Sequence, residues 1–237
     1  MILAAVLAAL ATAAQAAPST QQVAAEVECS SRPGAEGALC LAVSYSRSGR
    51  FAEAAGEFEK AARLAGPGPH ADRALAAAGN MWIGAGQPGK AALAIDRALS
   101  GAGLQAEQRG EALLDRARAA EAQNDLKAAR AKLNEAGASV SSDPFYWYFS
   151  AALAIREGDK AMAEIAIGKA LTMAPNDPTI LFEAGHVAHF AGDDAKARDY
   201  WRRAIAADPK GPVGKSANEA IALLAAPPVT KEPAATK

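Results

Sequence analysis

Two histidines have the spacing that most nearly suggests metal coordination. His186 and His189 stand three residues apart, about one turn of a helix, so their imidazoles can share a metal ion if this segment is helical. We nevertheless expect no metal, because no carboxylate or thiol stands at helical spacing on the same face. The chain also has only three histidines, too few for a three-histidine zinc site elsewhere. A pair of half-exposed surface residues is the simpler interpretation.

Other residue types also lack the arrangements that enzymes use. The sequence has no Gly-rich loop with Lys and Ser or Thr for phosphate, and no nucleophile elbow. Asp193 and Asp194 precede a predicted helix, and Asp125 and Asp159 occupy comparable turns, so N-capping accounts for all four carboxylates. We therefore predict no catalytic residue and no cofactor, and an enzyme with an unrecognised site remains only a minor alternative.

The composition favours packed helices and a protein partner. Alanine is abundant, aromatic residues make up only 5% of the chain, and the hydrophobic share of 51% is ample for a core. Lys plus Arg (25) nearly balance Asp plus Glu (26), which leaves a formal charge of -1. Nucleic acid and anionic membranes are therefore disfavoured as partners.

The first residues resemble a secretory signal. The run from Ile2 to Ala14 carries no charge and ends at Ala14-Gln15-Ala16, which has small residues where signal peptidase cleaves. We predict a signal peptide over 1–16, cleavage after Ala16, a periplasmic location and no membrane insertion afterwards. A buried N-terminal helix or an uncleaved anchor is the alternative, because no Lys or Arg precedes the run.

Cys29 and Cys40 are the only cysteines. Their separation of eleven residues resembles neither a zinc nor a redox motif. In an oxidising compartment such a pair often forms one disulfide, which would tie the segment before the first repeat to the first repeat helix. Two buried thiols are the alternative.

Prolines recur at a fixed interval along the second half of the chain. Pro144, Pro178 and Pro212 are each 34 residues apart, and Pro175 and Pro209 differ by 34 as well. Repeats of this length are typical of solenoids, in which each unit is covered only by its neighbours. We predict five units, at 35–68, 72–105, 110–143, 144–177 and 178–211.

The residues within these units resemble the tetratricopeptide repeat family, whose units are helix-turn-helix pairs. In the first unit, the aromatic, glycine and alanine positions of the family are filled by Tyr45, Gly49, Phe51, Ala54, Phe58 and Ala61. Matching positions in later units are held by Gly79, Trp82, Gly86, Ala91, Ile95, Ala98, Leu99, Leu126, Ala129, Leu133, Ala136, Trp147, Gly158, Ala163, Ile167, Ala170, Leu171, Pro175, Gly185, Gly192, Ala197, Trp201, Ala204 and Pro209. The resemblance implies an all-α fold, a right-handed α-solenoid of about five such units with a C-terminal capping helix.

The residues at the turns and at the helix starts support the predicted helix pairs. Glycines at the turn within four units predict a left-handed residue there, and Asn124 in the third unit is the next most tolerant type. Asp143-Pro144 and Asp177-Pro178 pair an N-cap acceptor with a proline in the first helical turn. We expect the three tryptophans to fill repeat positions in the core rather than to stack on a ligand.

The ends of the chain differ from the repeats. Residues 17–34 are predicted to be a short helix or arm, and 212–226 a capping helix with Lys215, Asn218 and Glu219 outward. The Pro, Thr, Lys and Glu content of 227–237 is typical of a disordered tail.

The resemblance also implies a partner and a surface. In this family the concave groove is lined by the first helix of each unit and holds a segment of another protein. We therefore expect a non-catalytic scaffold or adaptor for a protein or peptide in the bacterial cell envelope, in an oligomeric state that the sequence leaves open. A membrane-anchored spacer or self-assembly module of the envelope is the alternative. The family positions that line the groove carry Arg73, Asn80, Arg118, Tyr148, Arg156, Phe182, His186 and His189.

Overall fold

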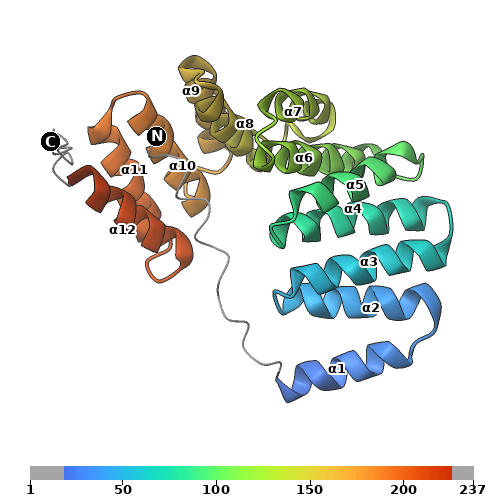
Figure 1. Ribbon diagram of the computed structural model, residues 1–237. Helices are drawn as coiled ribbons and strands as arrows, with labels where there is room; N and C mark the ends of the chain where they lie inside the picture. Colours follow the sequence, from blue (N-terminus) through green and yellow to red (C-terminus); the bar gives the residue numbers. More distant parts are fainter. Residues whose placement is uncertain (1–18, 226–237) are drawn as a thin grey trace, which may run out of the picture. The chain divides into compact units, whose positions relative to one another are not determined.

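The structure is a computed structural model that describes residues 19–225, and these residues form twelve α-helices and no strand (Figure 1). The predicted all-α repeat fold is confirmed. The predicted signal peptide and C-terminal tail lie outside the described residues. The helices are α1 (Thr20–Ser31), α2 (Gly34–Arg47), α3 (Phe51–Ala65), α4 (Pro69–Gly84), α5 (Pro88–Ser100), α6 (Ala106–Ala122), α7 (Leu126–Val140), α8 (Pro144–Glu157), α9 (Lys160–Met173), α10 (Pro178–Phe190), α11 (Asp194–Ala207) and α12 (Pro212–Ala225).

The chain divides into two compact units, one up to Ser141 and the other from Ser142 onward. In the first unit, α1 packs on α2, and the pairs α2–α3, α4–α5 and α6–α7 follow one another along the chain. In the second unit, the pairs are α8–α9 and α10–α11, and α12 packs on α11 and α10. We call α2, α4, α6, α8 and α10 the first helices, and α3, α5, α7, α9 and α11 the second helices. Neighbouring first helices touch, α4 on α6 and α8 on α10.

Two of the pairs, α4–α5 and α10–α11, close where a glycine of the first helix meets a bulky residue of the second. A β-carbon added at Gly79 of α4 would overlap Ile95 of α5, and one added at Gly185 of α10 would overlap the Trp201 ring of α11. Ile95 and Trp201 are buried, with 0% and 2% of their surface exposed. Small residues at these positions therefore let the two helices approach closely enough to enclose a large side chain.

Two of the three tryptophans are buried in the core, as predicted, and the third is only partly buried. Trp82 and Trp201 are buried, whereas Trp147 of α8 is only half-buried at the edge of its cluster. The Lys169 ammonium of α9 lies 3.8 Å from the centre of the Trp147 ring, close enough for a cation–π contact. Trp147 therefore packs between helices but keeps contact with solvent.

The turns within the pairs have the predicted backbone. Asn124 has φ of 62°, the only positive value at a non-glycine residue between 19 and 225. The glycines at the corresponding turns, Gly49, Gly86, Gly158 and Gly192, have φ between 68° and 88°. A left-handed residue ends the first helix and reverses the chain, and asparagine adopts this conformation more readily than most residues with a β-carbon.

Aspartates start most of the later helices, as predicted. Their carboxylates accept hydrogen bonds from backbone N–H groups of the first turn, which otherwise have no partner. The capping residues are Asp125 of α7, Asp143 of α8, Asp159 of α9, Asp177 of α10 and Asp193 of α11. The prediction is wrong for Asp194, which lies inside the first turn of α11 and contacts His189 instead.

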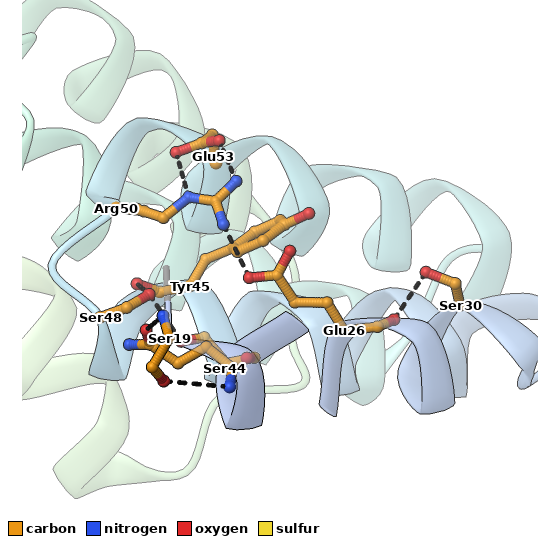
Figure 2. A network of polar contacts seen from close by, with 9 residues as sticks. Ser19, Glu26, Ser30, Ser44, Tyr45, Ser48, Arg50 and Glu53 are labelled. Atoms are coloured by element: carbon orange, nitrogen blue, oxygen red, sulfur yellow. Dashed lines mark hydrogen bonds and ion pairs between the residues drawn. The ribbon is translucent and has the colours of Figure 1, made fainter. Parts of the chain in front are cut away.

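Two links hold α1 against the first pair. Cys29 of α1 forms a disulfide with Cys40 of α2, so the predicted pairing is confirmed. Arg50, which precedes α3, reaches Glu26 of α1 at 2.7 Å and also bonds both carboxylate oxygens of Glu53. Its guanidinium lies 4.1 Å from the centre of the Tyr45 ring (Figure 2). A short helix whose only buried residue is the disulfide cysteine therefore gains fixed contacts with both helices of the pair.

We expect the contact between Arg50 and Glu53 to weaken in acid. Hydrogen bonding to Arg50 holds the pKa of Glu53 below its ordinary value of 4.5. The folded chain therefore binds this proton less readily than the unfolded chain does. The stabilisation is complete above the ordinary value and is lost as the pH falls through the lowered pKa. NMR titration of Arg50→Gln should show a raised Glu53 pKa, whereas Arg47→Gln, at an exposed arginine of α2, should leave it in place. An unchanged Glu53 pKa in Arg50→Gln would contradict this interpretation.

Candidate partner-binding surface

In the first unit, a polar link joins two neighbouring first helices. The Asn80 side-chain amide of α4 donates to one carboxylate oxygen of Asp115 in α6, at 2.8 Å. Arg118, one turn further along α6, donates to the other oxygen of Asp115, also at 2.8 Å. The structure thus connects two of the residues predicted for the surface through a carboxylate that we did not predict.

This link leaves Asn80 able to bind a peptide backbone. A side-chain amide has two N–H donors and one carbonyl acceptor, and Asp115 engages only one donor. The remaining donor and the carbonyl can pair with the C=O and N–H of a peptide bond. Because Asp115 is held by Arg118 as well, the orientation of the Asn80 amide is fixed before a partner arrives.

Arg73 of α4 does not join the link. Its guanidinium lies 3.1 Å from Nδ1 of His70, within the first turn of the same helix. On α2, Leu39 and Val43 are exposed apolar residues, with 38% and 39% of their surface accessible. The first helices of this unit thus combine apolar side chains with oriented polar groups, a mixture that suits a protein partner.

In the second unit, the predicted residues of α8 lie apart from each other. Tyr148 stacks on Phe145, with ring centres 5.2 Å apart, and packs against the core cluster of α8, α9 and α10. Arg156 is exposed in the last turn of α8, two turns further along the helix.

The predicted residues of α10 form an aromatic cluster with α11. Phe182 meets His186 edge to face, with ring centres 4.4 Å apart, and His186 lies at 5.7 Å from Trp201 in a similar geometry. Trp201 donates its indole N–H to the Phe182 carbonyl at 3.0 Å. This surface therefore offers two rings held in place by a buried tryptophan.

The expectation that no carboxylate accompanies these histidines is wrong. Glu183, one turn before His186, places a carboxylate oxygen 3.2 Å from its Nδ1. His189 has Nδ1 at 2.7 Å from Asp194 of α11. The sequence contained the signal for the first pair, because Glu183 and His186 stand three residues apart. The second pair joins α10 to α11 across the turn between them, so residue spacing along a single helix could not predict it.

Within residues 19–225, no group of three or more His, Cys, Asp or Glu side chains is arranged to hold a metal ion. No helix in the same range is both long and apolar enough to cross a bilayer. The polar groups of both surfaces are oriented by carboxylates and rings, an arrangement that suits hydrogen bonding and ring contacts with a partner.

The comparisons with known proteins concern the fold. No protein-family model and no curated sequence matches the chain. Among solved structures, YrrB, a TPR protein with an unusual peptide-binding site, is 18% identical over 86% of this chain and 100% of that one, with a TM-score of 0.53. A tetratricopeptide repeat protein from Parabacteroides merdae is 15% identical over 87% of this chain and 78% of that one, with a TM-score of 0.66.

A third similar structure is PilW, a widely conserved type IV pilus biogenesis factor. It is 16% identical over 77% of this chain and 81% of that one, with a TM-score of 0.63. At these identities the likeness is one of fold. The paired helices, their left-handed turns and these similar structures together show that the chain has the tetratricopeptide repeat fold.

Proposed function

We propose that the chain is a non-catalytic scaffold that holds a protein or peptide partner on its first helices. The observation that carries this proposal is the link from Asn80 through Asp115 to Arg118, which presents an oriented amide on two adjacent helices. A peptide bond can pair with that amide whatever its own side chain is. Apolar or aromatic neighbours of the peptide bond would then decide which partner is accepted.

The bacterial cell envelope is the proposed location, and 1–16 the proposed signal peptide. The uncharged N-terminal run and the disulfide between Cys29 and Cys40 support export, because disulfides persist in oxidising compartments. PilW, which has a similar fold, is a pilus biogenesis factor, so an adaptor role in envelope assembly is the form of the proposal. Helix pairs at 35–68, 72–105, 110–143, 144–177 and 178–211 would be its repeat units, between an arm at 17–34 and a cap at 212–226.

Crosslinking mass spectrometry in the native envelope, followed by capture with the purified chain, tests the function. A partner crosslinked at the first helices should be captured at least about tenfold less well by Asn80→Ala and by Arg118→Glu, since each removes an oriented group. Tyr148→Ala should weaken the binding of a partner that also contacts the second unit. The same material should show a mature N-terminus at Ala17.

Lys127→Ala is the matched control, because Lys127 is an exposed residue of the second helix α7. It should capture the partner as the unmodified chain does. If the control, Asn80→Ala and Arg118→Glu all capture the partner equally well, the proposal that the partner binds on this surface is contradicted. A cytosolic chain that retains Met1 would contradict the location.

A further inference from the structure

The outer side of α1 carries an apolar strip. Val23 and Val27 stand one helical turn apart and expose 45% and 66% of their surface, and Ala24 beside them is exposed as well. The helix lies next to α2 and forms the N-terminal edge of the first unit (Figure 1). Terminal elements of a repeat array usually turn a polar side to solvent, because no further unit covers them. The valines of α1 depart from that rule.

Polar and covalent links, rather than these valines, attach α1 to the unit. Glu26 pairs with Arg50 at 2.7 Å (Figure 2), and Cys29 forms the disulfide with Cys40. Cys29 is also the buried residue of the helix. The strip is therefore held in a fixed orientation without using its own apolar area, which lowers the entropic cost of docking a partner.

The ends of the chain do not supply a matching segment. After the cleavage proposed above, only Ala17 and Pro18 precede the cap residue Ser19. The residues after α12, 226–237, include a single large apolar side chain, that of Val229. An apolar strip on a helix is best covered by another apolar helix face, so the occupant comes from another molecule.

A second copy of α1 fits the strip. In a pair of antiparallel helices related by a two-fold axis, Val23 of one copy lies against Val27 of the other, and the symmetry repeats this contact. Ala24 then lies close to the axis, where its short side chain allows the two helices to approach closely. The strip continues into Thr20 and Ser31, which are exposed and uncharged, so the contact buries no charge along its length.

The charges of α1 also favour an antiparallel pair. Within Thr20–Ser31, the first turn has no acidic residue and the last turn has no basic one. Glu28 stands in the last turn, where the carbonyl end of the helix disfavours a carboxylate. Against an antiparallel copy, Glu28 lies beside the N–H end of the other helix, which favours a negative charge. Its largely exposed ion pair with Arg32, at 2.7 Å, is too weak to decide the arrangement.

We propose that two copies of the chain associate through this strip, with their α1 helices antiparallel and Val23 of each copy against Val27 of the other. A helix of twelve residues is about 18 Å long, so the contact buries less than the roughly 1,200–2,000 Å² of a stable interface. The dimer is therefore weak and depends on concentration. It goes beyond the function proposed above, because two joined copies present two Asn80 surfaces to one partner.

Sedimentation equilibrium of the full chain, with its disulfide formed, measures the association at concentrations up to about 1 mM. We expect a reversible equilibrium between monomer and dimer. A chain that stays monomeric over this range would overturn the proposal and leave the strip to a different protein.

Val27→Glu tests the strip itself. The dimer Kd should rise at least about tenfold, because the introduced carboxylate loses hydration against Val23 of the other copy. Leu93→Glu is the matched control, since Leu93 of α5 lies in the same unit and is 69% exposed, close to the value for Val27. The control should dimerise as the unmodified chain does. Equal dimerisation by both variants would overturn the assignment, because the contact would then lie on another surface.

Mixing Val23→Lys with Val27→Glu tests the orientation. Each variant alone should associate weakly, whereas the equimolar mixture should regain at least about tenfold in affinity, because the introduced ammonium of one copy meets the introduced carboxylate of the other. A mixture that associates no better than either variant alone would overturn the antiparallel pairing. Asn80→Ala should dimerise as the unmodified chain does, so this outcome is independent of the partner-binding surface.

Discussion

Gly185→Ala is expected to lower the free energy of unfolding by about 2 kcal/mol, although alanine is the better helix former. The added β-carbon would overlap the indole of Trp201, which is 2% exposed and cannot move without leaving its place between α10 and α11. Overpacking of this kind costs about 1–3 kcal/mol. Displacing the ring also weakens its hydrogen bond to the Phe182 carbonyl, worth about 1 kcal/mol, whereas the gain in helix propensity is about 1 kcal/mol.

Gly168→Ala is the control for this prediction, because it makes the same substitution in the interior of the neighbouring helix α9. No atom lies within 4 Å of the added carbon, so the propensity gain should appear alone, as a rise of about 0.5–1 kcal/mol. Urea unfolding followed by circular dichroism measures both variants. Changes of the same sign would show that the close approach of α10 and α11 does not require glycine.

Removing the disulfide is expected to release α1 while the rest of the first unit stays folded. The bond closes a loop of eleven residues, for which the loop-entropy relation gives about 3 kcal/mol. Cys29 is the one buried residue of α1, and a helix of twelve residues is marginal in water by itself. The Arg50–Glu26 ion pair, whose side chains are about one-fifth exposed, is too weak to replace that constraint.

Hydrogen exchange of the Cys29→Ser, Cys40→Ser variant measures this release. Amides of α1 should exchange at least about tenfold faster than in the oxidised chain, while amides of α4 and α5 keep their protection. Adding a reductant to the unmodified chain should reproduce the effect, and adding it to the double variant should change nothing further. Full protection of α1 in the variant would contradict the prediction, because it would show that packing on α2 holds α1 in place without the disulfide.

For function, the consequence is that the docking of α1, at the edge of the first unit, depends on the redox environment. With the disulfide formed, α1 stays on α2 even though Val23 and Val27 of α1 are exposed, with 45% and 66% of their surface accessible. The opposite end of the chain, α12, instead exposes Lys215, Asn218 and Glu219. Oxidative export would thus give α1 its anchor, in agreement with the proposed location.

Much of the fold follows from residues close together in the sequence. Asn124 has a left-handed backbone at its turn, as predicted, because a turn needs one tolerant residue and asparagine tolerates positive φ. Asp143 and Asp177 cap their helices as predicted, because the capping hydrogen bonds span only two or three residues. Pattern and period could therefore predict where these helices begin and end.

The candidate surface was only partly predictable. The family resemblance placed Asn80 and Arg118 on the first helices, but nothing in the spacing singled out Asp115 as the group that joins them. His186 and His189 were predicted as neighbours, whereas the structure gives each a carboxylate of its own. Arg73 was predicted on the same surface, yet it turns toward His70 within its own helix.

The sequence by itself determined the all-helical repeat, its turns and its caps, because those features depend on backbone preferences and hydrogen bonds within a few residues. Only the tertiary structure decided that Asn80 meets Asp115 across 35 residues and that Glu26 of α1 meets Arg50 while the valines of that helix stay exposed. Such contacts depend on how far neighbouring helices stand apart and on which rotamer each side chain adopts. Both are set by the packing of several helices together, which no spacing along one helix encodes.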